Sequence, residues 1–144
     1  MFDIYFEAGD PVAYDDEGWL GMQGTTILGD FREDFIAPLG WWSRPEYEQQ
    51  WLDGATRLLD GQSKSAFVIE PGRLWWTAWR EDEKVRVQQQ LLVPSESVEA
   101  WTRVPRSVPY ELVPERRRLS PDGDPVSDWT VATADLREFI ARRA

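Results

Sequence analysis

Apolar and polar residues alternate at the start of the chain. Phe2, Ile4 and Phe6 fall on one side of an extended segment, and the polar residues between them fall on the other. A period of two residues is typical of a strand that buries one face, so we predict a strand at residues 2–7. A second strand is predicted at residues 19–28, where two glycines indicate a bulge. The acidic segment between these strands contains a proline and is predicted to be an exposed loop.

A helical period begins further along the chain. Ser43 and Glu46 have the S-x-x-E spacing of a capping box, which marks the first turn of a helix. Gly61 supplies the left-handed conformation that commonly ends a helix. We therefore predict a helix at about residues 44–60, with Trp42 packing back on its first turns. Its buried face is predicted to consist of Tyr47, Trp51, Ala55, Leu58 and Leu59.

Short β-type segments follow this helix. Runs rich in β-branched and aromatic residues predict three strands, at residues 65–70, 74–79 and 85–93. The charged segment R-E-D-E-K at residues 80–84 separates the second run from the third. The two runs are therefore predicted to form an antiparallel hairpin with a charged tip.

The last third of the chain is less regular. Six prolines between residues 94 and 125 argue against a long helix there. A final strand is predicted at residues 127–131, and Thr133 is predicted to cap a terminal helix at about residues 134–142. Two short edge strands are predicted within the irregular segment, at residues 101–104 and 110–113.

This order of elements indicates the fold class. Two strands, a helix, three strands, an irregular segment, a strand and a helix are typical of an α+β fold. We expect a mostly antiparallel sheet with the two helices packed on it. A chain of 144 residues is most simply one domain, so residues 1–144 are predicted to be a single domain.

Two residue types are missing, and this limits the chemistry. The chain has no cysteine and no histidine, which excludes disulfides, thiolate chemistry and histidine-based nucleophile systems. The glycine spacing in GWLGMQGTTILGD matches no phosphate-binding motif, and PDGDPVSD lacks most ligands of a calcium loop. We therefore expect no enzyme activity, no cofactor and no metal, although a carboxylate pair remains a conceivable catalytic device.

The charge is unevenly distributed along the chain. Residues 1–72 contain 14 acidic and 4 basic residues, for a net charge of −10, whereas residues 73–144 contain 12 of each. Binding nucleic acid through phosphate contacts needs a basic surface, so direct nucleic-acid binding is not expected. An acidic surface attracts basic partners and speeds their association, although acidity can also simply keep a protein soluble.

The acidic residues of the predicted loops are the candidates for contact with a partner. No spacing among them selects a catalytic pair. They are candidates because they are charged and lie in loops that are predicted to be exposed. The candidates are Asp10, Asp15, Asp16, Glu17, Asp30, Glu33, Asp34, Glu81, Asp82 and Glu83.

The tryptophans suggest an alternative function. Nine tryptophans could stack on sugars or another small ligand, and exposed ones would make the chain a binding module. However, Trp51 falls on the apolar helix face, while Trp41 and Trp42 lead into that helix. Trp75 and Trp76 lie in the predicted hairpin. Most of the tryptophans are therefore expected to be in the core.

Several blocks of the sequence resemble a known family. They are PLGWWSRPEYEQQWLDGATRLLDG, SAFVIE, LWWTAWREDEKVRVQQQLLV and DGDPVSDWTVATADLREFIARR. The most distinctive parts are W-x-x-P-x-Y-x-x-Q-W at 42–51, V-Q-x-Q-L at 87–91 and G-x-P-x-S-x-W at 123–129. From about residue 20 to its end, the chain resembles immunity proteins of contact-dependent growth inhibition systems (CdiI type).

The resemblance implies a function that composition alone does not. An immunity protein of this family binds the C-terminal toxin domain of a cognate exported protein, often a nuclease, and blocks it. The resemblance also implies a cytoplasmic protein without a cofactor. We expect this protein to act as a monomer that forms a 1:1 complex with its toxin. The chain has no apolar run long enough to cross a membrane and no secretory signal at its start, so no membrane association is expected. The family prescribes no common set of toxin-binding residues.

Overall fold

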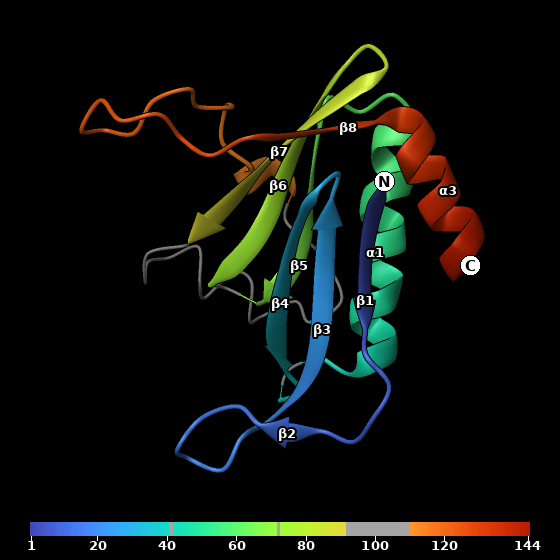
Figure 1. Ribbon diagram of the computed structural model, residues 1–144, viewed down its shortest axis with the longest axis vertical. Coiled ribbons are helices and arrows are strands. Elements are labelled where there is room, and N and C mark those ends of the chain that lie inside the picture. The colour runs from blue at the N-terminus through green and yellow to red at the C-terminus, as the bar shows by residue number, and fades with distance from the viewer. Residues whose placement is uncertain (41, 72, 92–109) are drawn as a thin grey trace.

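The computed structural model describes residues 1–40, 42–71, 73–91 and 110–144. Within these ranges the chain forms two four-stranded antiparallel sheets and two α-helices (Figure 1). The first sheet contains β1 (Phe2–Phe6), β2 (Val12–Ala13), β3 (Leu20–Leu28) and β4 (Phe31–Pro38). The second contains β5 (Lys64–Glu70), β6 (Leu74–Glu81), β7 (Lys84–Leu91) and β8 (Trp129–Ala132). The helices are α1 (Arg44–Leu59) and α3 (Thr133–Arg143), with one 3₁₀ turn, η1 (Tyr110–Leu112). The predicted α+β class is confirmed.

The first sheet is organised around β3. This strand pairs with β1 and β2 along one side and with β4 along the other. β4 lies where the sequence pattern predicted no strand, because the charged run from Arg32 to Asp34 obscures its alternation. The residues Gly29 and Asp30 form a two-residue turn between the strands, with Gly29 at a φ of 65°. A Gly-Asp pair between two extended segments is a hairpin signal.

The second sheet contains the predicted hairpin. β5, β6, β7 and β8 are adjacent in that order, and β6 and β7 pair from Leu74↔Leu91 to Glu81↔Lys84. The hairpin turn therefore consists of Asp82 and Glu83, and Asp82 has a positive φ of 56°. β8 then pairs with β7 and brings the C-terminal part of the chain back to this sheet.

The predicted helix start is confirmed in detail. The Ser43 Oγ accepts a hydrogen bond from the Glu46 amide, and the Glu46 carboxylate accepts one from the Ser43 amide. The Trp42 and Tyr47 rings are 5.3 Å apart between centroids, which is the contact of a hydrophobic staple. Gly61 has a φ of 98° just after the helix. The local sequence therefore specifies both ends of α1.

Three predictions in the C-terminal part need correction or fall outside the described residues. The N-cap of α3 is Ala132, not Thr133, and its amide donates to the Asp135 carboxylate at 2.8 Å. Thr133 is already helical, and its hydroxyl donates to Glu83 at 2.6 Å. The segment predicted as a strand at 110–113 contains the 3₁₀ turn η1 instead. The strand predicted at 101–104 lies outside the described residues.

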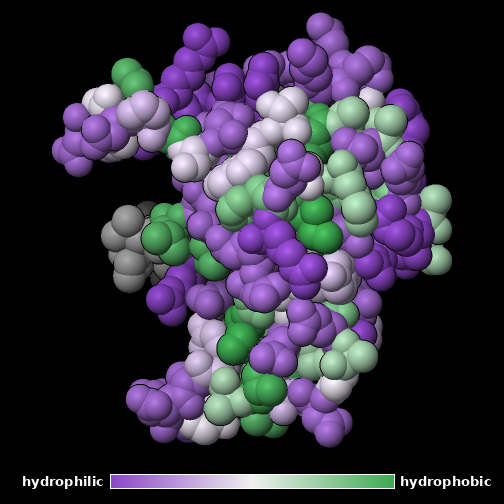
Figure 2. All heavy atoms as spheres, in the orientation of Figure 1, coloured by the Kyte–Doolittle hydropathy of each residue, from purple (hydrophilic) through white to green (hydrophobic). Residues whose placement is uncertain are grey.

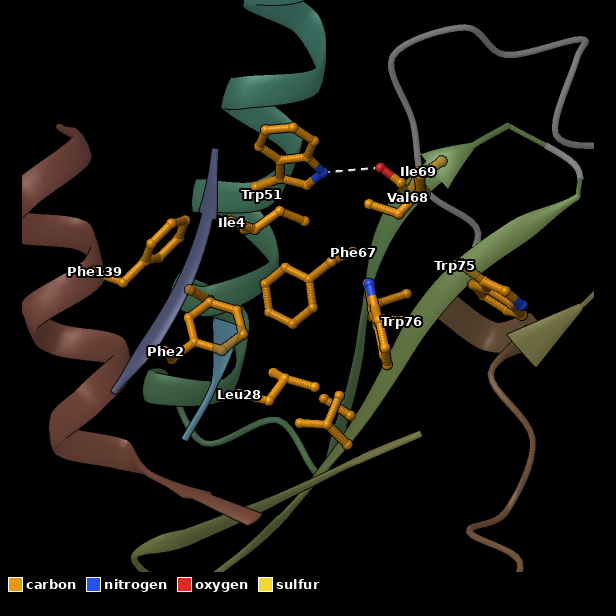
Figure 3. Close-up of a cluster of buried hydrophobic side chains, with 14 of the residues drawn as sticks. Phe2, Ile4, Leu28, Trp51, Phe67, Val68, Ile69, Trp75, Trp76 and Phe139 are labelled. Atoms are coloured by element: carbon orange, nitrogen blue, oxygen red, sulfur yellow. Dashed lines mark hydrogen bonds between the residues drawn. The ribbon is translucent and has the colours of Figure 1, made fainter. Parts of the chain in front are cut away.

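The core lies where the two sheets meet the helices (Figure 3). Phe67 of β5 is in its centre, with Phe2 of β1 at a ring-centroid distance of 5.1 Å. On the other side, Phe139 of α3 contacts Phe2 at 5.0 Å. Trp51 of α1 is buried, and its indole N–H donates to the Val68 carbonyl at 2.8 Å. Helix and sheet are thus joined by both apolar packing and a directed hydrogen bond.

Gly54 allows α1 to approach β5 closely. A Cβ at this position would lie 2.7 Å from the Ala66 carbonyl oxygen. The neighbouring Ser65 hydroxyl donates to the Gly54 carbonyl at 2.8 Å. A glycine inside a helix normally lowers its stability, but here it is needed for the packing of helix on strand.

Candidate partner-binding surface

The ten acidic residues predicted to contact a partner lie in three parts of the molecule. Around β2 these are Asp10, Asp15, Asp16 and Glu17; at the β3–β4 hairpin they are Asp30, Glu33 and Asp34; at the β6–β7 turn, here called the hairpin tip, they are Glu81, Asp82 and Glu83. All are exposed except Glu33, which is half-buried. The β2 end of the molecule is at the bottom of Figure 1 and the hairpin tip is at the top. The predicted residues therefore do not form one surface.

The loop between β2 and β3 (residues 14–19) is ordered by one of its own acids. The Asp15 carboxylate accepts hydrogen bonds from the Glu17 amide at 3.0 Å and from the Trp19 amide at 3.2 Å. The Tyr14 amide also donates to the Trp19 carbonyl at 2.8 Å. Asp15 thus has a structural role. Asp16 and Glu17 project from the loop and, among the described residues, form no ion pair.

The acids of the β3–β4 hairpin differ from one another in their contacts. The Asp34 carboxylate lies 3.0 Å from the buried Thr25 hydroxyl and 3.7 Å from the Arg32 guanidinium. Glu33 points to the opposite face of β4, where its carboxylate accepts a hydrogen bond from the Gln89 amide at 2.8 Å. Asp30 is exposed in the turn. Glu33 therefore joins the two sheets, whereas Asp30 and Asp34 are accessible to a partner.

The tertiary structure brings two of the predicted contact residues, Asp15 and Asp34, together with two acids that are not among the candidates, Glu7 and Glu70. A hollow of about 640 Å³ is lined by Asp15, Asp34, Glu7, Glu70, Tyr14 and Arg73, together with strand residues of β3 and β4. The hydroxyl of Thr25 lies 3.0 Å from both Glu7 and Asp34, so its single proton can serve only one of them at a time. Burial raises the pKa of the Tyr14 hydroxyl, and the charge of Glu70 raises it further.

Glu70 ends β5 and Arg73 lies in the turn that follows, and both were missed because they are far from Asp15 in sequence. No local pattern connects these positions. Glu7 could have been found, because it is on the outward face predicted for the first strand.

Two of the three acids of the hairpin tip, Glu81 and Glu83, are paired with basic residues. Glu81 lies 3.2 Å from Arg86 and 3.6 Å from Arg116, and Glu83 lies 3.7 Å from Arg80. The hydrogen bond from the Thr133 hydroxyl lowers the pKa of Glu83, and the charge of Arg80 acts in the same direction. The hairpin tip therefore presents much less uncompensated negative charge than its sequence suggests.

The tryptophans are mostly structural. Among the described residues, the buried ones are Trp42, Trp51, Trp75, Trp76 and Trp79. Trp129 is partly buried, with its ring centroid 4.4 Å from that of Phe31. Only Trp19 is exposed within the described ranges, with 42% of its surface accessible. This does not favour a module that stacks sugars on two exposed tryptophans. Trp41 and Trp101 lie outside the described residues.

Two further observations concern metals and membranes. Over residues 1–40, 42–71, 73–91 and 110–144, no cluster of three or more acidic, cysteine or histidine side chains could hold a metal ion. In the same ranges no helix combines the length and apolarity needed to cross a membrane.

The fold resembles that of a solved toxin–immunity complex. A chain of the "CdiA-CT/CdiI toxin and immunity complex from Enterobacter cloacae" matches with a TM-score of 0.83 and 24% sequence identity, covering 99% of this chain and 98% of that one. A protein of Enterobacter cloacae subsp. cloacae, "Immunity protein CdiI", is 28% identical over 146 residues, or 96% of each chain.

The family is established by a match to most of the chain. Residues 37–139 match the CdiI N-terminal domain family. The chain belongs to this family. The resemblance inferred from its sequence blocks is thereby confirmed.

Proposed function

We propose that this chain is an immunity protein that binds and neutralises the C-terminal toxin domain of a cognate contact-dependent growth inhibition protein. The observation that carries this proposal is similarity along nearly the whole chain, at 96% coverage, to a protein named Immunity protein CdiI. Its fold also matches a chain from a complex of CdiA-CT with CdiI. Fold alone does not define function, so family membership is the stronger support.

The charge distribution suggests how such a protein would recognise its toxin. A nuclease needs a basic surface to hold nucleic acid. The excess negative charge of this chain comes entirely from residues 1–72, and Asp16 and Glu17 are exposed there. These acids would attract a basic toxin domain and speed its association in a salt-dependent way. The toxin is accordingly proposed to be a nuclease.

Inhibition then requires binding and no chemistry by the immunity protein. The absence of histidine and cysteine from the sequence is compatible with such a role. We place this activity in the cytoplasm, as a 1:1 complex that has no cofactor. Occupation of the toxin surface would prevent the toxin from contacting its substrate.

The test is to purify this chain with the C-terminal toxin domain encoded beside it. Size-exclusion chromatography with light scattering should show a 1:1 complex, and co-expression of this chain should restore growth to cells that produce the toxin domain. A toxin domain from an unrelated system serves as the control and should neither bind nor be neutralised. If the cognate domain remains toxic and unbound, the proposed function is wrong. A separate assay for cleavage of RNA and DNA by the toxin domain alone tests whether it is a nuclease.

A further inference from the structure

An apolar patch lies at the β2 end of the molecule, beside the β2–β3 loop. Trp19 is 42% exposed and Leu20 is 54% exposed. Together with Leu39, Gly40 and Glu17 they line a shallow hollow of about 350 Å³. In Figure 2 apolar residues reach the surface at this lower end, next to a projecting hydrophilic loop. Large apolar side chains that share one exposed patch are a feature of interaction sites.

The patch is held in a fixed geometry. The backbone of Trp19 accepts a hydrogen bond from the Tyr14 amide at 2.8 Å and donates one to the Asp15 carboxylate at 3.2 Å. The carbonyl of Leu20 accepts one from the Leu39 amide at 2.9 Å. A segment whose backbone is already ordered loses less conformational entropy when a partner binds. These hydrogen bonds therefore prepare the patch for binding.

The position of the Trp19 ring depends on a glycine. A Cβ at Gly40 would come within 2.0 Å of the six-membered ring of Trp19. The ring therefore lies directly against the backbone at Gly40. Only a residue without a side chain leaves room for it there, so the chain accommodates a large side chain at the surface without enclosing it in the core.

The surroundings of the patch indicate the chemistry of its partner. Asp16 and Glu17 precede Trp19 by three and two positions, and both are exposed. Asp15 of the same loop also lines the hollow of about 640 Å³ that contains the carboxylates of Glu7, Asp34 and Glu70. An apolar centre beside acids that form no ion pair with another described residue is complementary to an apolar side chain surrounded by lysine and arginine. Tryptophan is also among the residues most often responsible for binding energy at interfaces.

We propose that Trp19 and Leu20 form the central contact with the cognate toxin domain, which places an apolar side chain in this hollow and basic residues against Asp16 and Glu17. This rests on the proposed function and names the surface that carries it out. Trp19 and Leu20 would set the dissociation rate of the complex. Asp16 and Glu17 would set its association rate.

The experiment measures binding of the purified toxin domain to immobilised variants of this chain. Trp19→Ala should weaken binding about 30-fold, mainly through faster dissociation. Leu20→Lys should weaken it about tenfold, because it places a positive charge in the apolar contact opposite a basic partner. Leu119→Lys is the matched control: Leu119 is 57% exposed, similar to Leu20, but lies between η1 and β8. This control should bind within about twofold of wild type.

The outcomes separate the inference from the function on which it rests. If wild type binds but Trp19→Ala and Leu20→Lys bind equally well, the surface is wrong and the proposed function stands. An equal loss for Leu119→Lys would also overturn the inference, since the effect would not be specific to the patch. If wild type itself does not bind the toxin domain, the proposed function fails. Circular dichroism checks folding, and Leu20→Lys decides the question if Trp19→Ala does not fold.

Discussion

Two acidic turns of this protein have nearly the same sequence character but different surroundings. The β2–β3 loop contains Asp15, Asp16 and Glu17, and the hairpin tip contains Glu81, Asp82 and Glu83. In the hairpin tip, arginines of β6, β7 and the segment before β8 pair with Glu81 and Glu83. In the loop, one acid orders the backbone and, among the described residues, the other two form no ion pair.

The difference shows that a run of acids in a sequence is not a measure of negative surface. The basic residues that neutralise the hairpin tip come from residues 73–144, where acids and bases are equal in number. The β2–β3 loop belongs to the half with four bases for 14 acids, so few cations are available to it. The charge that a partner meets therefore depends on which cations the fold brings near each turn.

The largest effect expected from this comparison is on stability at the hairpin tip. Arg116 lies 2.7 Å from Asp128 and 3.6 Å from Glu81, and both Arg116 and Asp128 are mostly buried. Arg116→Ala should therefore lower the free energy of unfolding by about 1–2 kcal/mol, because it leaves Asp128 without its cation. Urea denaturation measures this change. Asp16→Ala in the loop is the comparison and should change stability by about 0.5 kcal/mol or less; equal losses would show that the two turns do not differ.

An intermediate effect is expected on the rate of toxin binding. Asp16→Lys combined with Glu17→Lys should slow association with the toxin domain about five- to tenfold, since the attraction of basic residues is lost. Asp15 is left intact because it orders the loop. Stopped-flow measurements at two salt concentrations should show a smaller salt dependence than in wild type.

The matched control for this variant is Asp122→Lys with Asp124→Lys, which changes the net charge equally at exposed positions before β8. Association of this control should remain close to the wild-type rate. An equal slowing in both variants would mean that only the overall charge matters and that the loop has no special role.

The smallest effect concerns the pH dependence of stability at the hairpin tip. The Thr133 hydroxyl lowers the folded-state pKa of Glu83 below its ordinary value of 4.5. The carboxylate therefore contributes stability in full above the unfolded pKa, and loses it as the pH falls through the lower, folded pKa. Glu83→Gln should be less stable than wild type at neutral pH, with the difference disappearing in acid. Thermal melts between pH 7 and about 3 measure this, and Thr133→Val, which removes the hydrogen bond, should give the same pattern. A stability difference between Glu83→Gln and wild type that does not change with pH would contradict this prediction.

Local features were the most predictable part of the fold. The capping box at Ser43 and Glu46 and the stop at Gly61 act within a few residues, and each is present. The alternation of Phe2, Ile4 and Phe6 also placed their side chains in the core correctly. β4 was missed because charged residues on both faces of an edge strand remove the periodic signal.

The candidate surface was less predictable than the fold. Exposure of the loop acids followed from their polar surroundings, but Trp19 was not singled out, because most of the tryptophans were expected to lie in the core. Its ring lies against Gly40, about twenty positions away. No period or motif reports such a contact.

The sequence by itself determined the elements whose causes are local: the ends of α1, the β6–β7 hairpin and the acidity of the first half of the chain. Only the tertiary structure decided which acids are neutralised. Arg116 reaches Glu81 from a position 35 residues later. Glu7, which follows β1, Asp34 of β4 and Glu70 of β5 meet around one hollow although they are far apart in the sequence. The physical reason is that electrostatic interactions depend on distance in space, which strand pairing sets and sequence spacing does not.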